Sequence, residues 1–336
     1  MNEVITLSHG SGGRLTHNLI SEIFHNYFNN NILLENGDAA VFNVKADKLA
    51  FSTDSYVITP LTFKGGDIGK LAVCGTVNDL SVSGAIPKYL SCGFIIEEGL
   101  PLSVLESIAR SMSCAADEAG VQIITGDTKV VQRGCADKLF INTSGIGIIP
   151  DGVLLSTGYI QKGDKILVSG TIGDHGTSIL VEREGFFLSS SISSDCAPLN
   201  GLALNLVRQL GSNIRFMRDP TRGGLAATLN EIAEDIPFGI RLHEDTIPVV
   251  KQVRGICDML GIDPLYMANE GKLLAIVDDK FCEKALEIMK SHKYGVNASI
   301  IGEIESNYPG KVYLSTITGG KRVIDMPVGD QLPRIC

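Results

Sequence analysis

The chain has 336 residues, of which 44% are hydrophobic, and this is enough to bury a sizeable core and favours two domains over one. The formal net charge is -9 and no run of basic residues occurs, which argues against a nucleic-acid-binding protein. The N-terminus lacks the pattern of a signal peptide, no apolar stretch is long enough to cross a membrane, and the eight cysteines include no Cys-x-x-Cys pair, so we expect a cytoplasmic protein without membrane contact.

The N-terminal half alternates helical and strand patterns. A polar glycine loop at residues 7–13 comes first and leads into a predicted helix. The predicted helices cover residues 15–27, 67–83 and 102–119, and the predicted strands cover residues 49–58, 89–96, 121–127 and 140–149. This alternation is typical of the α/β (α+β) fold class.

The C-terminal half begins after the turn residues at 150–152. Its predicted strands cover 165–169 and 273–277, its predicted helices cover 200–210, 219–234 and 281–291, and a Ser-rich loop covers 185–200. Asp219 as the N-cap and Pro220 at the first helical position predict the start of the second helix. The final segment has little periodicity, which predicts an exposed, movable tail. We therefore divide the chain into an N-terminal domain (1–155), a C-terminal domain (156–326) and a tail (327–336).

Four aspartates lie beside glycine, alanine or β-rich apolar segments, where a lone carboxylate is costly to bury. They are Asp38, Asp54, Asp79 and Asp127. Carboxylates at the ends of strands can converge on one face of a sheet, and Mg²⁺ binds a few carboxylates together with phosphate oxygens and water. The alternative for any one of them is turn formation or helix capping, but the four together favour a magnesium site.

Two further features suit the binding of a polyphosphate. Lys129 follows Asp127 by two residues, so the two side chains share a face of a strand, although a solvated surface lysine is the alternative. Arg222 stands at a predicted helix start, where unpaired N–H groups and the helix dipole attract anions. Ordinary capping is the alternative there.

The glycine loop near the N-terminus is another phosphate-binding candidate. Between His9 and Arg14 it holds Gly10, Gly12 and Gly13, whose backbone N–H groups can surround phosphates, although such loops are also simply flexible. The chain has neither a Walker A loop nor a Gly-x-Gly-x-x-Gly fingerprint after a strand. The sequence therefore indicates neither a P-loop NTPase nor a dinucleotide-binding protein.

The chain also offers a candidate base and a candidate thiol acceptor. Glu270 precedes a predicted apolar strand, where its carboxylate can face a cleft and act as a general base, although the residues alone favour a turn residue. Cys336 is the last residue, which is too close to the end for a prenylation signal, and Arg334 favours its thiolate. A chance cysteine at the chain end is the alternative.

These motifs together resemble the HypE family of hydrogenase maturation proteins, within the superfamily of aminoimidazole ribonucleotide synthetase, selenophosphate synthetase and thiamine-monophosphate kinase. The resemblance covers essentially the whole chain. It rests on residues 8–13 (Ser-His-Gly-Ser-Gly-Gly), 36–40 (Asn-Gly-Asp-Ala-Ala), 52–55 (Ser-Thr-Asp-Ser), 75–80 (Gly-Thr-Val-Asn-Asp-Leu), 125–129 (Thr-Gly-Asp-Thr-Lys), 218–224 (Arg-Asp-Pro-Thr-Arg-Gly-Gly), 269–271 (Asn-Glu-Gly) and 333–336 (Pro-Arg-Ile-Cys). The terminal motif is specific to this branch, whereas the aspartate motifs belong to the wider superfamily.

The resemblance implies a two-domain aminoimidazole ribonucleotide synthetase-like fold in a homodimer. Strands of two N-terminal domains close a barrel, nucleotide binds near that interface, and the C-terminal domain is an α/β layer. It also implies that the carbamoyltransferase HypF loads a carbamoyl group on Cys336. The enzyme then uses ATP and Mg²⁺ to dehydrate this group to a thiocyanate. The cyano group passes to an iron centre on the HypC–HypD complex, for a nickel–iron hydrogenase.

The resemblance further implies roles for individual residues. Metal is assigned to Asp38, Asp54, Asp79 and Asp127, and nucleotide to Gly10, Gly12, Gly13, Asp54, Asn78, Asp79, Asp127 and Arg222. Lys129 supplies a cation near the phosphoryl group, Glu270 is the preferred base and His9 is the second choice. Cys336 is then a carrier, so the tail needs an inward position for dehydration and an outward one for loading and delivery.

Two other functions remain open at this point. One is a superfamily enzyme that acts on a free small molecule, as selenophosphate synthetase does, although that enzyme usually carries a reactive Cys or selenocysteine in the N-terminal glycine loop and this loop has none. The other is a nucleotide-binding scaffold whose tail docks a partner without chemistry.

Overall fold

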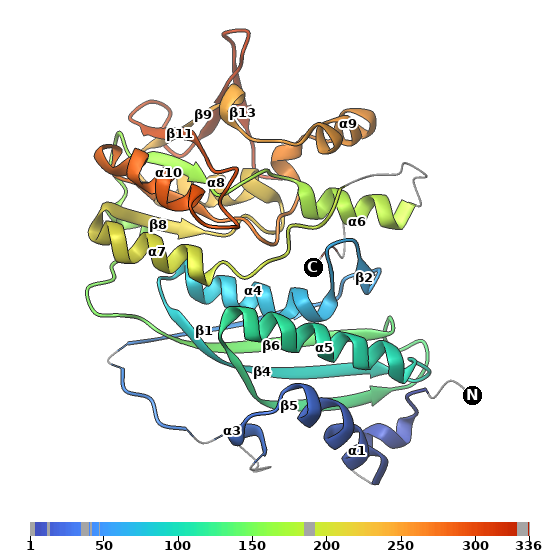
Figure 1. The fold of residues 1–336 in the computed structure, drawn as a ribbon. Coiled ribbons are helices and arrows are strands. Elements are labelled where there is room, and N and C mark those ends of the chain that lie inside the picture. The colour runs from blue at the N-terminus through green and yellow to red at the C-terminus, as the bar shows by residue number, and fades with distance from the viewer. Residues whose placement is uncertain are drawn as a thin grey trace.

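The described part of the chain folds around two large β-sheets, one from each half of the sequence (Figure 1). The computed structural model describes residues 4–11, 14–34, 40, 42–46, 48–184, 192–327 and 335. No helix within these ranges is long and apolar enough to cross a membrane. A short hairpin of β2 (Thr62–Phe63) and β3 (Gly66–Asp67) stands apart from both large sheets.

The N-terminal half forms a four-stranded sheet. Its strands lie in the order β1 (Leu49–Tyr56), β6 (Leu139–Ile148), β4 (Ile86–Glu97) and β5 (Gln122–Val131). The β1–β6 and β6–β4 pairs are antiparallel, while β4 and β5 are parallel and are connected by α5 (Leu102–Ala119). A helical connection of this kind is what a parallel pair requires, and it places α5 on one face of the sheet.

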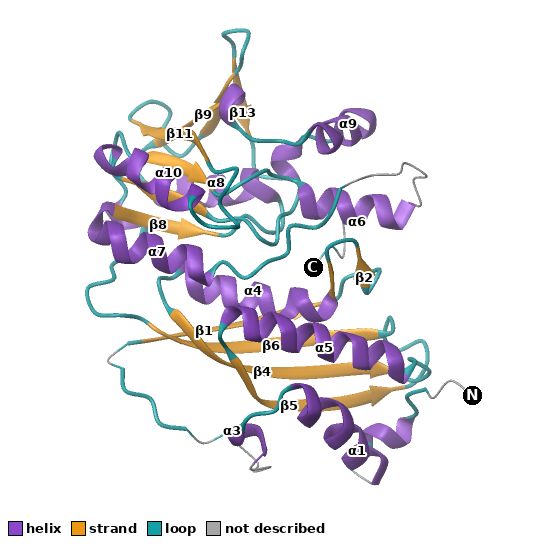
Figure 2. Ribbon diagram, in the orientation of Figure 1, coloured by secondary structure: helices purple, strands orange, loops and turns teal. Residues whose placement is uncertain are grey.

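Helix α4 (Ile68–Val82) lies between the first sheet and the C-terminal half (Figure 2). Asp67 caps it, since its carboxylate accepts a hydrogen bond from the backbone N–H of Lys70 at 2.9 Å. Every residue of the helix except Lys70 and Asp79 is buried. A helix that is apolar all round must be covered on all sides, so Asp79 is the exception that needs an explanation.

The C-terminal half forms a seven-stranded sheet. Its strands lie in the order β13 (Lys321–Ile324), β12 (Val312–Ser315), β9 (Gly239–His243), β11 (Ser299–Glu305), β7 (Lys165–Val168), β10 (Leu274–Val277) and β8 (Ile214–Arg218). The helices of this half are α6 (Asp174–Glu184), α7 (Asn200–Leu210), α8 (Gly224–Asp235), α9 (Lys251–Leu260) and α10 (Cys282–Lys290).

Helices cover both faces of this second sheet. Along β10, Leu274 and Ile276 pack in the same cluster as α8, while Ala275 and Val277 pack with α7 and α10. Successive side chains of a strand point to opposite faces, so β10 is buried on both sides and is apolar throughout. The predicted α/β class, with a layered C-terminal half, is confirmed.

The elements predicted from strong periodicity are confirmed, and α5 and α7 begin and end at the predicted residues. The first predicted helix is α1 (Arg14–Leu19), a π-helical turn (Ile20–Phe24) and α2 (His25–Tyr27) in succession. The sequence pattern does not predict the short strands β8, β9, β11, β12 and β13 or the helices α6 and α9. Each of these is too short, or too irregular in its apolar spacing, to stand out without its tertiary partners.

The predicted helix start at Asp219 is wrong. Helix α8 begins at Gly224, and its N-cap is Gly223, with φ values of 59° and 72°. Two successive left-handed residues interrupt any helix that began earlier. The carbonyl of Pro220 instead accepts hydrogen bonds from the backbone and side-chain N–H groups of Asn269, at 3.2 and 2.8 Å. Asp219 is therefore buried in a turn and does not cap a helix.

The expectation of an exposed tail is wrong at its penultimate residue. Ile335 is only 5% exposed and belongs to the same apolar cluster as Phe63, Ile179 and Cys196. Residues 328–334 and Cys336 lie outside the described residues. Burial of one isoleucine side chain contributes about 1.5–3 kcal/mol to the free energy of packing. This packing holds Ile335 against the core.

Candidate functional site

An acidic groove lies between the two halves of the molecule. It has a volume of about 480 Å³ and is lined by Ser52 of β1, Asp79 of α4 and Asp219, which follows β8. The hydroxyl of Ser52 donates to Oδ2 of Asp79 at 2.7 Å. Asp79 breaks the otherwise apolar surface of α4 because it faces this groove.

The carboxyl groups around this groove affect one another. Burial, followed by the charge of Asp79, raises the pKa of Asp219 to about 7. Burial also raises the pKa of Asp79, against the hydrogen bond from Ser52 and with a further contribution from Asp54. Like charges that lie close enough to raise each other's pKa favour a bound cation. Asp219 is not among the predicted site residues, because its Asp-Pro segment resembles the start of a helix.

A further carboxyl group, that of Glu270, is buried close enough to Asp219 and Asp54 for their charges to affect its pKa. It is 3% exposed, and its Oε1 has no hydrogen-bond partner among the described residues. Burial raises its pKa well above the ordinary value, with further contributions from Cys196 and Asp195. A buried carboxyl group without a partner is costly, and groups with strongly shifted pKa values cluster at functional sites. The prediction that Glu270 faces a functional cleft has this structural support.

The loop that carries Glu270 is fixed from several directions. The backbone N–H of Glu270 donates to Oδ1 of Asp195 at 3.0 Å, and the side chain of Asn269 binds the backbone of Gly173 and Pro220 at 2.8 Å each. At Gly271, a Cβ atom would lie 1.8 Å from the carbonyl oxygen of Asp195. Only glycine permits this crossing of two loops, which holds Glu270 in place.

Asn78, predicted to bind nucleotide, joins the two halves of the chain. Its amide group donates to the carbonyls of Ala197 and Glu270 at 3.1 Å each, and its Oδ1 accepts from the N–H of Leu199 at 2.8 Å. Both amide N–H donors are therefore used within the protein. In this structure the side chain positions the Glu270 loop against α4.

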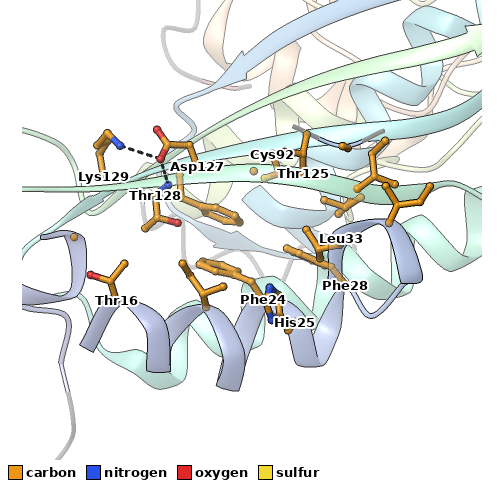
Figure 3. Close-up of a pocket in the computed structure, with 18 residues that line it drawn as sticks. Thr16, Phe24, His25, Phe28, Leu33, Cys92, Thr125, Asp127, Thr128 and Lys129 are labelled. Carbon is orange, nitrogen blue, oxygen red and sulfur yellow. Dashed lines mark hydrogen bonds and ion pairs between the residues drawn. The ribbon is translucent and has the colours of Figure 1, made fainter. Parts of the chain in front are cut away.

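The pair Asp127–Lys129 lies in a different place, on β5. Nζ of Lys129 is 2.9 Å from Oδ1 of Asp127, which confirms that the two side chains share a face. The hydrogen bond from Lys129 lowers the pKa of Asp127. Figure 3 shows this pair on one side of the strand and Thr128 on the other, toward Thr16. An exposed ion pair contributes little to stability, so both groups are available to a ligand.

A pocket of about 340 Å³ lies next to this pair, between β5 and the N-terminal helices. The rings of Phe24 and Phe94 stack at 4.7 Å in its wall, and Thr128 and Lys129 are at its rim. Gly10 also lines it, and a Cβ atom there would meet the backbone N of Val130 at 2.8 Å. An apolar, aromatic-lined pocket with a cation at its rim suits a heteroaromatic ring with a charged substituent.

The predicted aspartates do not form one site within a single chain. Asp54 is opposite Thr143, whose hydroxyl donates to a carbonyl of α4, whereas Asp127 is opposite Gly93 on the other face of the sheet. Three strand spacings also separate β1 from β5, which is about 14 Å. No cluster of three metal-ligating side chains occurs in the described ranges. The predicted convergence on one face is therefore corrected.

The remaining predicted residues are dispersed. His9 forms a local cap with Thr6, whose hydroxyl is 2.9 Å from its Nδ1, and it lines a different cavity from that of Asp127 and Lys129. Arg222 is exposed in the turn before α8. Asp38, Gly12, Gly13 and Cys336 lie outside the described residues.

The sequence and the structure have close relatives among known proteins. Residues 36–149 match the family "AIR synthase related protein, N-terminal domain" and residues 161–315 match its C-terminal-domain counterpart. The carbamoyl dehydratase HypE of Bradyrhizobium diazoefficiens is 50% identical over 335 residues, which cover 100% of this chain and 97% of the relative.

Two solved structures are similar over most of the chain. A crystal structure of the hydrogenase maturation protein HypE in complex with ATP matches with a TM-score of 0.94 and 49% identity, covering 98% of this chain and 99% of the other. A crystal structure of a HypE–HypF complex matches with a TM-score of 0.81 and 48% identity, covering 92% and 99%. The fold is therefore that of the AIR synthase-related proteins, and the chain belongs to the family of the carbamoyl dehydratase HypE.

Proposed function

We propose that this chain is an ATP-dependent carbamoyl dehydratase that acts on its own terminal thiol, Cys336. The observation that carries the proposal is the burial of Ile335 in the apolar cluster that also contains Cys196, whose neighbour Asp195 binds the backbone N–H of Glu270. Ile335, the residue next to the terminal cysteine, is thus packed near the two loops that hold Glu270, the candidate base. The full-length identity to HypE proteins supports this function against that of selenophosphate synthetase.

The reaction removes one water from an S-carbamoyl group and leaves a thiocyanate. When bound, ATP supplies a phosphoryl group that turns the carbamoyl oxygen into a leaving group, so that oxygen departs in phosphate. The two nitrogen protons must leave for the carbon–nitrogen triple bond to form. Glu270 is suited to accept a proton because its raised pKa makes it, once ionised, a stronger base than an exposed glutamate.

The groove carboxylates fit a magnesium ion. Mg²⁺ is held by one or two carboxylates plus phosphate oxygens, so a cluster of three is not needed. The charge of Asp79 adds to burial in raising the pKa of Asp219, and the charge of Asp54 adds to burial in raising the pKa of Asp79, so a cation would relieve the repulsion among these carboxylates. We assign the ion to these two residues with Asp54, and Asp38 remains a candidate. When bound, the ion neutralises the charge that develops on the phosphates.

The nucleotide site is best completed by a second copy of the chain. The face of the first sheet opposite α4 exposes Phe51, which is 70% accessible, with Leu49 and Ile95. An exposed apolar surface of this kind, which includes two residues of the edge strand β1, favours burial against a partner. If β1 of one copy lies beside β5 of the other, Lys129 and Asp127 of the second copy come next to the strand of the first copy that carries Ser52 and Asp54. We propose this composite arrangement for the homodimer.

Partners and compartment follow from the same proposal. The similarity to a structure of HypE bound to HypF supports a HypF-type carbamoyltransferase as the donor of the carbamoyl group. A HypC–HypD complex is the proposed acceptor of the cyano group. Cysteines of the described chain are free thiols, which fits the proposed cytoplasmic location.

The test follows the mass of the tail. Endoproteinase Lys-C releases residues 322–336, in which Cys336 is the sole cysteine. Incubation with carbamoyl donor and transferase should add one carbamoyl group to this peptide, and ATP with Mg²⁺ should then remove one water. No change of mass would favour a docking scaffold. An ATP-dependent turnover of a free substrate by the Cys336→Ala variant would favour a small-molecule enzyme.

A further inference from the structure

His175 binds the tail directly. It lies in the first turn of α6 and is completely buried. Its Nε2 is 2.6 Å from the carbonyl oxygen of Ile335, and its Nδ1 is 2.8 Å from Oγ of Ser194. The Ile335 carbonyl belongs to the peptide unit that precedes Cys336. The hydrogen bond therefore restrains the attachment point of the terminal residue.

The direction of each hydrogen bond in this group is determined. A carbonyl oxygen can only accept, so Nε2 carries a proton. Burial lowers the pKa of His175, which favours the neutral ring, and Nδ1 of the neutral ring accepts from the hydroxyl of Ser194. The same hydroxyl oxygen accepts from the backbone N–H of Cys196 at 3.1 Å. The chain of donors thus links the Ile335 carbonyl to the loop that also holds Glu270 through Asp195.

The β2–β3 hairpin and the loop that contains Ser194 hold the imidazole ring in position. Phe63 of the β2–β3 hairpin packs against it edge-on, with ring centroids 5.6 Å apart. The hairpin in turn accepts a hydrogen bond at the carbonyl of Lys64 from the N–H of Ser194, at 2.8 Å. Gly65, with φ of 101°, lets the chains approach, since a Cβ atom there would lie 2.5 Å from Oγ of Ser193. A ring fixed this firmly is a preorganised receptor.

We propose that His175 is a positioning residue that latches the tail inward, with Ser194 orienting the ring. The latch itself does not depend on the proposed function. Only its consequence, that the latched tail brings the modified thiol near Glu270, rests on that function. One neutral hydrogen bond shifts an equilibrium by roughly tenfold at most, so the latch stabilises the inward position and still allows release. A carrier that must reach other proteins requires such a balance.

The latch can be tested without ATP chemistry. The probe is N-ethylmaleimide, and the readout is the labelling rate of Cys336 in the Lys-C peptide 322–336, relative to exposed Cys135 in peptide 130–138. In the full chain, His175→Ala should raise the relative rate about tenfold. His175→Gln should restore much of the protection, because its amide N–H can reach the same carbonyl.

An unchanged Cys336 rate in His175→Ala would overturn the latch. Buried Cys74, in peptide 71–88, reports on folding. If Cys74 also becomes reactive in His175→Ala, the Ser194→Ala variant is used instead, because it removes only one oxygen atom and disturbs the fold less. A faster labelling rate of Cys336 in Ser194→Ala supports the latch, and a rate equal to that of wild type overturns it. In a variant that labels Cys336 faster, single-turnover dehydration should be correspondingly slower. A wild-type dehydration rate in such a variant would overturn the positioning role. If the wild-type protein failed to dehydrate its tail, the proposed function would fail while labelling still tested the latch.

Discussion

Glu270 donates its backbone N–H to Asp195 at 3.0 Å, while Asp195 is paired with Lys272 at 3.1 Å. Asp195 thus has a counter-ion, whereas Oε1 of Glu270 has no hydrogen-bond partner in the described part of the chain. The nearby charge of Asp195 therefore adds to burial in raising the pKa of Glu270. One carboxylate of the pair holds the loop in place, and the carboxyl group of Glu270 is left for proton transfer.

Glu270→Gln should abolish dehydration and leave binding intact. The amide has the same shape but cannot accept a proton at neutral pH, so the single-turnover rate should fall by about 10²- to 10⁴-fold. ATP affinity, measured by calorimetry, and carbamoyl loading of Cys336 should remain at wild-type levels. Glu287→Gln, at an exposed position of α10, is the matched control and should retain full activity. Wild-type dehydration in Glu270→Gln would remove this residue from the mechanism.

The same substitution should stabilise the protein at neutral pH. The folded-state pKa of Glu270 is raised, so the folded state binds the proton more tightly than the unfolded state does. Stability is then highest below the ordinary pKa of a glutamate and is lost as the pH rises from there toward the folded-state pKa. The melting temperatures of Glu270→Gln and wild type should be equal near pH 4. At pH 7 the melting temperature of the variant should be higher than that of wild type. A lower melting temperature of the variant at pH 7 would contradict the raised pKa.

Mixing two inactive variants should restore activity if the site is shared between copies. Asp79→Asn removes a groove carboxylate and Lys129→Ala removes the β5 cation. In a mixed dimer, one site combines both defects and the other combines both intact residues. Co-expressed variants should therefore recover about a quarter of wild-type activity, since half of the dimers are mixed and one site in each works. The control is Asp79→Asn with itself, and no recovery in the mixture would mean that each chain holds a complete site.

The sequence predicted the elements of the first sheet but not the face on which Asp127 lies. At β5 the pairing with β4 shifts between Ile123 and Thr125, so Ile124 is an extra residue. Such a bulge turns every later side chain to the opposite face. Gly126 and Thr128 thus follow the core face of β4, and Asp127 points away. Nothing in the local pattern announces the bulge, because isoleucines at both positions suit a strand.

The sequence also did not predict which polar residues are buried. His175 stands between Asp174 and Gly176 without a motif, and its role depends on a tail that is distant along the chain. Asp219 was recognised only as a turn-forming residue, since its neighbours across the groove come from β1 and α4. Local spacing thus selected Lys129 as a candidate and the family resemblance selected Glu270, while the tertiary fold decides what each faces. The domain division at residue 155 stays a prediction.

Gly271→Ala should disrupt the site and the fold together. The added Cβ would lie 1.8 Å from the carbonyl oxygen of Asp195, so one of the two loops must move. We expect a loss of about 3 kcal/mol in the free energy of unfolding and a loss of dehydration. Gly255→Ala is the matched control, because it lies in α9 with no neighbouring atom in the way. That variant should gain about 0.5–1 kcal/mol, and equal effects at the two positions would refute the crossing-loop argument.

Asp219→Asn should weaken nucleotide binding only when magnesium is present. If Asp219 helps to hold the ion, its loss should lower the affinity for Mg²⁺–ATP by about ten- to a hundredfold. Without magnesium, the carboxylate repels the phosphates, so the variant should bind metal-free ATP as tightly as wild type or more tightly. Asp235→Asn, at the exposed far end of α8, is the matched control and should change neither affinity. Calorimetric titrations with Mg²⁺ and with EDTA separate the two cases: a loss of equal size in both would assign Asp219 a structural role.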